Sequence, residues 1–139
     1  MSLIHRHRNG IPPDPDAAPL DAVAGLPEQT RELLRWFKLR ESAQAIVDAV
    51  GLLNQHLEAT APWKLAKDPN AARELDAVVS QQLATAQVIA DALAPITPSL
   101  AQRARRQLTA QPRLPALEPL IQRLETRGLA PDHAQFAEA

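Results

Sequence analysis

The sequence predicts an all-α protein folded as an antiparallel helix bundle. Two long segments, 39–60 and 70–93, carry apolar residues spaced three and four apart, which is the period of an amphipathic helix. The 13 prolines fall largely between apolar segments. Proline ends one helix and precedes the next, because it lacks an amide donor and restricts the residue before it. No strand-like alternation competes with this pattern, so short connections between antiparallel helices are expected.

Length and composition limit the possible classes of protein. A chain of 139 residues is long enough for one domain with a modest core. Aromatic residues make up only 3% of it, so Leu, Ala, Val and Ile must build the core. The absence of cysteine excludes disulfides and thiolate metal sites. No apolar run approaches the roughly 20 residues that span a bilayer, and the N-terminal residues lack an apolar signal core. We therefore expect a soluble, cytoplasmic chain.

The N-terminal third is divided by Gly and Pro. Residues 1–8 can form a turn or two of helix, which ends at Asn9-Gly10, and residues 12–19 form a Pro-rich loop. We therefore treat residues 1–16 as the end of a first helix plus this loop. The next helix is expected to end near Phe37, and it is either kinked at Pro27 or starts there.

The segment from Leu39 to about Thr60 gives the clearest helical pattern. Asn54 lies close to its apolar stripe, where it is interpreted as a buried amide that bonds to the backbone. Pro62 ends the helix. The predicted buried stripe consists of Leu39, Ala43, Ile46, Val47, Val50, Leu53 and Leu57.

A second long helix follows Pro69 and is closed by Pro95. Thr97 is the expected N-cap of a short helix to about Leu108, with Pro98 in its first turn. Residues 111–116 form a connector, 117–127 a further turn or two, and 128–139 a frayed tail, so the bundle spans 17–127. The predicted buried stripe of the second long helix consists of Leu75, Val78, Val79, Gln82, Leu83, Ala86, Ile89, Ala90 and Leu93.

The corner between the two long helices, residues 61–69, reads Ala-Pro-Trp-Lys-Leu-Ala-Lys-Asp-Pro. A tryptophan here is either a wedge that fills the gap between helix ends or a half-exposed platform for an unpaired base. Composition alone favours the wedge for Trp63. As a platform, it would have Lys64 and Lys67 beside it to meet phosphate groups.

Charge gives no global attraction to nucleic acid, since the formal net charge is −1. Any RNA-binding surface must therefore be local. Taken singly, each basic patch is interpreted as a solvated face, and only their meeting on one surface would count as evidence. The three patches are His5-Arg6-His7-Arg8, Lys64 with Lys67, and Arg103, Arg105 and Arg106 with Arg113.

The sequence predicts no catalytic residue, no metal ligand and no cofactor. It has no Gly-rich phosphate loop, and no serine lies in a context typical of a nucleophile. His5 and His7 are two residues apart, while His56 and His133 are isolated, so none has the spacing of a zinc pair on a helix. All four are interpreted as surface residues.

Several segments together resemble a known family. Residues 53–69, Leu-Asn-Gln-His-Leu-Glu-Ala-Thr followed by the corner, are similar to the middle of the anticodon-binding domain of methionyl-tRNA synthetase, a class I aminoacyl-tRNA synthetase. The resemblance extends from about Leu3 to Glu125. It includes Leu3-Ile4-His5-Arg6, Asn9-Gly10-Ile11-Pro12, the stretch 89–104 and the tail residues Glu118-Pro119-Leu120, Arg123 and Glu125.

The resemblance implies a tRNA-binding module with the fold of a class I anticodon-binding bundle. Trp63 matches the tryptophan that stacks on the anticodon, and Asn54 and Pro62 would support its corner. Lys64, Lys67, Arg6 and Arg8 are the expected phosphate contacts, and DNA is not expected as a ligand. The family's catalytic signatures, His-x-Gly-His and Lys-Met-Ser-Lys-Ser, are absent, so aminoacylation would need another polypeptide. The Asn and Arg that read anticodon bases lie upstream of the aligned segment, which implies weak, poorly selective binding.

The resemblance also implies a protein partner. In the family, the helix before the corner and the Pro-Leu tail pack against the catalytic domain, which leaves Trp36, Phe37, Leu120 and Ile121 as a candidate interface. Either a synthetase catalytic chain or self-association would cover them, or the tail itself folds back over them. The alternative function is a helical interaction scaffold that has lost specific tRNA readout.

Overall fold

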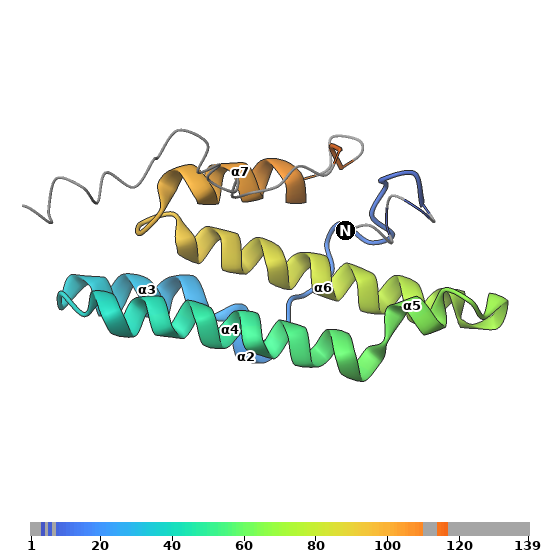
Figure 1. Cartoon of the computed structure of the whole chain (residues 1–139), viewed down its shortest axis with the longest axis horizontal. Helices are drawn as coiled ribbons and strands as arrows, with labels where there is room; N and C mark the ends of the chain where they lie inside the picture. Colours follow the sequence, from blue (N-terminus) through green and yellow to red (C-terminus); the bar gives the residue numbers. More distant parts are fainter. Residues whose placement is uncertain (1–3, 5, 7, 110–113, 117–139) are drawn as a thin grey trace, which may run out of the picture.

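The computed structural model describes residues 4, 6, 8–109 and 114–116. As predicted, these residues form an all-α fold, and no strand occurs among them. The elements run in the order α2 (Asp21–Ala24), α3 (Leu26–Arg35), α4 (Leu39–Thr60), α5 (Pro62–Leu65), the 3₁₀ turn η1 (Pro69–Ala71), α6 (Ala72–Leu93) and α7 (Pro98–Leu108) (Figure 1).

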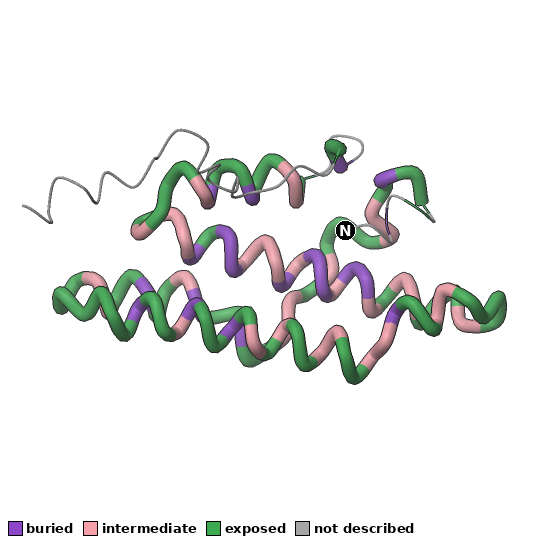
Figure 2. The backbone as a smooth tube through the Cα atoms, viewed as in Figure 1, coloured by how far each residue is buried: buried purple, intermediate pink, exposed green. Residues whose placement is uncertain are grey.

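Helix α6 is the centre of the bundle. The α3–α4 hairpin packs along one side of it, α7 lies along the other, and α5 packs near its start (Figure 1). Buried and half-buried residues therefore recur along α6 from turn to turn (Figure 2). Every apolar position predicted for this helix, from Leu75 to Leu93, is buried or half-buried. The predicted face of α6 is thus confirmed.

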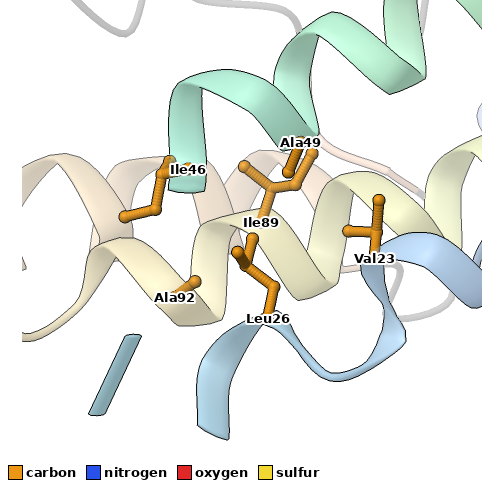
Figure 3. Packing of buried hydrophobic residues seen from close by; sticks show 6 residues of the cluster. All are labelled: Val23, Leu26, Ile46, Ala49, Ile89 and Ala92. Atoms are coloured by element: carbon orange, nitrogen blue, oxygen red, sulfur yellow. The ribbon is translucent and has the colours of Figure 1, made fainter. Parts of the chain in front are cut away.

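Two hydrophobic clusters lie on different sides of α6. In the larger one, Ile89 and Ala92 of α6 meet residues of α2, α3 and α4 (Figure 3). The smaller one joins α6 to the N-terminal turn and to the connector after α7 through Ile4, Val79, Leu83 and Leu114. The buried members of the larger cluster are Val23, Leu26, Ile46, Ala49, Ile89 and Ala92.

Buried hydroxyl groups on α6 hold the Pro-rich loop. The backbone N–H of Leu20 donates to Oγ1 of Thr85 at 2.9 Å, and the N–H of Asp14 donates to Oγ of Ser80 at 3.1 Å. The loop has no regular backbone hydrogen bonds of its own. The two hydroxyl groups therefore accept from backbone N–H groups that would otherwise be left without a hydrogen-bond partner. They fix the loop 12–19 across the bundle.

The helix that was predicted to end near Phe37 is divided into two helices, α2 and α3. Gly25 ends α2 and precedes α3, and Pro27 lies in the first turn of α3. Of the two predicted alternatives, the second therefore holds: α3 starts at the turn that contains Pro27, and Pro27 does not kink a longer helix. α3 ends at Arg35, earlier than predicted, because Phe37 has a φ of 57° and turns the chain toward α4.

Helix α4 has the predicted bounds, but much of the predicted buried stripe is exposed. Ser42, Ala45, Ile46 and Ala49 face the bundle, whereas the neighbouring arc faces solvent. Small side chains on the inner arc let α3 and α6 approach closely, and these two helices cover only that arc. We call the exposed arc the outer stripe; it consists of Leu39, Ala43, Val47 and Val50.

The ends of α6 and α7 differ slightly from prediction. η1 precedes α6, and the Asp68 carboxylate accepts from the N–H of Asn70 at 2.9 Å. Pro98 lies in the first turn of α7 as expected, but Thr97 makes no capping hydrogen bond with its side chain. Its hydroxyl instead donates to the carbonyl of Leu93.

The connector reaches the N-terminal turn, since the N–H of Leu114 donates to the carbonyl of Gly10 at 2.7 Å. The predicted turn at 117–127 and the frayed tail at 128–139 lie outside the described residues, as do Arg113, Leu120, Ile121, His5, His7 and His133. No described helix has the length and apolar character needed to cross a membrane.

Candidate nucleic-acid interface

The corner is built from a left-handed residue and a buried proline. Ala61 ends α4 with φ 41° and ψ 60°, and its N–H donates to the carbonyl of Leu57. Pro62 then starts α5 and is almost fully buried. Its fixed φ suits the first helical position, where its missing N–H breaks no hydrogen bond. The chain is therefore redirected within two residues.

Trp63 follows the buried proline and is 46% exposed. The wedge interpretation favoured by composition is wrong, because Trp63 is exposed and Pro62 is the buried residue of α5. The indole of Trp63 consequently presents free apolar surface on a short, fixed helix.

Two lysines accompany Trp63. Lys64 and Lys67 are both exposed, and neither forms an ion pair with another residue in the described part of the chain. The nearest acidic residue in sequence, Asp68, accepts a backbone N–H from Asn70. Both ammonium groups are therefore available to an external anion.

A polar cluster supports the corner from behind. Nε2 of Gln82 on α6 donates to Oγ1 of Thr60 at 3.1 Å and lies 3.4 Å from Nδ1 of His56. The Thr60 hydroxyl in turn donates to the carbonyl of His56 at 2.7 Å. This cluster ties the last turn of α4 to α6. The prediction that His56 is an ordinary surface residue is wrong, since it is half-buried here.

Asn54 does not belong to this cluster. Its side chain is exposed, so the buried-amide interpretation is wrong, and it has no hydrogen bond to a described residue. Sequence reasoning missed the role of Thr60. The only signal was Gln82, a polar residue within the apolar stripe of α6, which needs a partner when buried.

The remaining basic patches lie near opposite ends of α6, since Arg8 pairs with Asp76 near its start and Arg105 pairs with Asp91 near its end. Arg8 forms an ion pair with Asp76, whereas Arg6 is exposed. On α7, Nε of Arg105 lies 2.7 Å from Oδ1 of Asp91, and Arg103 and Arg106 are exposed. Figure 1 places α7 along one part of α6 and the corner at the far end of the molecule.

The candidate protein interface is only partly described. Trp36 is 70% exposed and Phe37 is 96% exposed, so neither is a core residue. Nε1 of Trp36 donates to the Glu32 carboxylate at 2.9 Å. Within the described residues, no group of three or more His, Cys, Asp or Glu side chains is arranged to hold a metal ion.

Comparison with known proteins adds one consistent similarity. No family model matches the chain. It is 29% identical over 89 residues to the methionine–tRNA ligase of Clostridium acetobutylicum, covering 64% of this chain and 14% of that protein. It is 28% identical over 114 residues to the ligase of Deinococcus radiodurans, covering 78% of this chain and 17% of that protein. The ligase of Neisseria meningitidis is 29% identical over 96 residues, covering 67% of this chain and 14% of that protein.

These similarities indicate a domain related to methionyl-tRNA ligase. The chain spans well under a fifth of the length of these relatives.

Proposed function

We propose that this chain is a tRNA-binding helical module of the anticodon-binding type, which holds tRNA while another polypeptide carries out aminoacylation. The observation that carries the proposal is the exposed Trp63 beside Lys64 and Lys67 on a corner fixed by Pro62. An indole can stack on an unpaired base, and two ammonium groups can neutralise phosphates on either side of it. Similarity to methionine–tRNA ligases supports tRNA as the RNA class.

The corner provides affinity without much discrimination. Stacking contributes about 1–3 kcal/mol per base and tolerates any base, whereas bidentate hydrogen bonds distinguish one base from another. Asn54 is the polar residue that the resemblance assigns to this corner, and it points to solvent without a described partner. The module would therefore depend on a partner for selectivity. We infer that a synthetase catalytic chain supplies it, in keeping with the exposed Trp36 and Phe37.

A second candidate function is a helical interaction scaffold without RNA binding. The outer stripe of α4 favours it, because contiguous exposed apolar surface often marks an interface.

Binding of initiator methionine tRNA and of other tRNAs at two salt concentrations separates the two functions. A tRNA-binding module should bind with a dissociation constant that rises with salt, and Trp63→Ala should weaken binding at least about tenfold. Trp36→Ala, at the opposite end of α4, is the matched control and should leave the affinity unchanged. Absence of tRNA binding at the lower salt concentration would leave the scaffold as the better hypothesis.

A further inference from the structure

A cavity of about 420 Å³ lies between the N-terminal turn, residues 8–11, and the start of α6. The turn is closed by a hydrogen bond from the N–H of Ile11 to the carbonyl of Arg8 at 3.0 Å. The side chain of Ile11 is 45% exposed and forms part of the apolar lining. The volume lies in the range of pockets that hold small ligands. The described lining consists of Arg8, Asn9, Ile11, Ala72, Leu75 and Asp76.

The lining contains one ion pair, which joins the turn to α6. Arg8 and Asp76 form this pair, and their side chains are 42% and 31% exposed. Water therefore reaches both groups, and such a pair contributes at most about 1 kcal/mol. The Asp76 carboxylate can be hydrated when its partner leaves. The Arg8 guanidinium can thus exchange the carboxylate for a phosphate group, to which it can donate two parallel hydrogen bonds.

The cavity lies at the same end of α6 as the corner. Both α5 and η1 contact α6, and Ala72 is the first residue of that helix. Lys67 precedes Ala72 by five positions, which span at most about 18 Å even in a fully extended chain. A short single-stranded segment whose phosphates meet Lys67 can therefore reach the cavity with a neighbouring nucleotide.

We propose that this cavity binds a second unpaired nucleotide of the same RNA that stacks one base on Trp63. The second base packs on Ile11 and Leu75. Its phosphate takes the place of the Asp76 carboxylate on Arg8. Contact with the face of the ring tolerates any base, so the cavity raises affinity for single-stranded RNA without choosing a sequence. This inference rests on the proposed function, because the contact at Trp63 holds the neighbouring nucleotide.

Filling the cavity tests the proposal on the full chain. Ala72→Phe places a ring where the base would lie, and it should weaken binding of initiator methionine tRNA at least about fivefold. It should also flatten the dependence of log affinity on log salt by about 0.7, although it removes no charge, because the phosphate on Arg8 leaves together with its base. Ala77→Phe adds the same ring at an exposed position of α6 outside the described lining and should change neither quantity. Circular dichroism checks that both variants fold.

A second variant tests the exchange of partners on Arg8. Arg8→Gln should flatten the salt dependence by the same amount as Ala72→Phe. The double variant should lose no more than either single variant, because both substitutions act on one bound nucleotide. Losses that add would place the phosphate contact and the cavity at separate sites, which would overturn the proposal.

The outcomes separate this inference from the proposed function. Binding of tRNA that requires Trp63 but is unchanged by Ala72→Phe would overturn the cavity site and leave the tRNA-binding module in place. Absence of tRNA binding would overturn both. A free nucleotide carries the same chemical groups, so adenosine monophosphate is the comparison ligand. It should bind far more weakly than the tRNA, because it lacks the contact at Trp63, and equal affinity would overturn the assignment to RNA.

Discussion

Oγ1 of Thr60 accepts a hydrogen bond from Nε2 of Gln82 at 3.1 Å, which joins the last turn of α4 to the middle of α6. Gln82 is buried and Thr60 is half-buried. The bond lies directly before the left-handed Ala61, where α4 ends. It therefore fixes the position from which Pro62 and Trp63 leave the bundle.

Thr60→Val should lower the free energy of unfolding by about 1–3 kcal/mol, because the buried Gln82 amide loses an acceptor while the side-chain shape is kept. Urea denaturation measures this change. Thr97→Val is the matched control, since the Thr97 hydroxyl also bonds to the carbonyl four residues earlier but is exposed. Equal losses for both variants would show that the bond between helices contributes nothing.

Ala61→Gly should raise the free energy of unfolding by about 1 kcal/mol, because glycine adopts the left-handed conformation without the steric cost that a Cβ incurs. Ala59→Gly, two residues earlier on α4 and exposed, should lower it by about 0.8–1 kcal/mol, as glycine does in a helix. The two substitutions remove the same methyl group, so opposite signs identify the backbone conformation. A loss of stability at both positions would contradict the left-handed cap.

Sequence was sufficient for α6 and insufficient for α4, for a physical reason. α6 packs against helices on several sides, so every apolar residue of its predicted stripe is covered and the pattern identifies the buried face. α4 carries a wider apolar arc than α3 and α6 can cover. Periodicity locates such an arc, but it cannot tell whether Ser42 and Ala49 or Val47 and Val50 face inward. Small residues were buried because they allow close helix packing.

The corner shows a similar limit. The prolines located it, but composition favoured a buried Trp63, whereas the buried residue of the corner is Pro62 and Trp63 is exposed. The left-handed Ala61 has no sequence signal, because alanine rarely adopts that conformation. Likewise, the pairing of Thr60 with Gln82 joins residues 22 positions apart and follows only from how the two helices pack.

Fluorescence can test whether the Trp63 indole stacks on RNA. The chain has two tryptophans, so Trp36→Phe leaves Trp63 as the sole indole emitter. Addition of initiator methionine tRNA should quench its emission, because a stacked base lies against the ring. Trp63→Phe leaves only Trp36, at the other end of α4, and its emission should not respond. Quenching of Trp36 alone would place the RNA at the α3–α4 turn instead.

Replacing both Lys64 and Lys67 with Gln should flatten the dependence of log affinity on log salt by about 1.4, the slope expected for two phosphate contacts to a single strand. The loss should be similar for all tRNAs, because phosphate contacts carry no base information. Arg103→Gln with Arg106→Gln removes two exposed cations from α7 and should leave the slope unchanged. A slope that stays the same in the lysine variant would mean that both lysines are only solvated.

Arg8 should contribute to RNA binding only when it is released from Asp76. The two side chains form an exposed ion pair, and such a pair contributes at most about 1 kcal/mol, so a phosphate must replace the carboxylate at a small cost. Asp76→Asn removes this competition and should raise tRNA affinity by up to about fivefold. Asp91→Asn releases Arg105 on α7 from a somewhat more exposed pair and changes the net charge by the same amount. Equal gains in both variants would reflect net charge alone, whereas a gain confined to Asp76→Asn would assign Arg8 to the RNA-binding surface together with the corner.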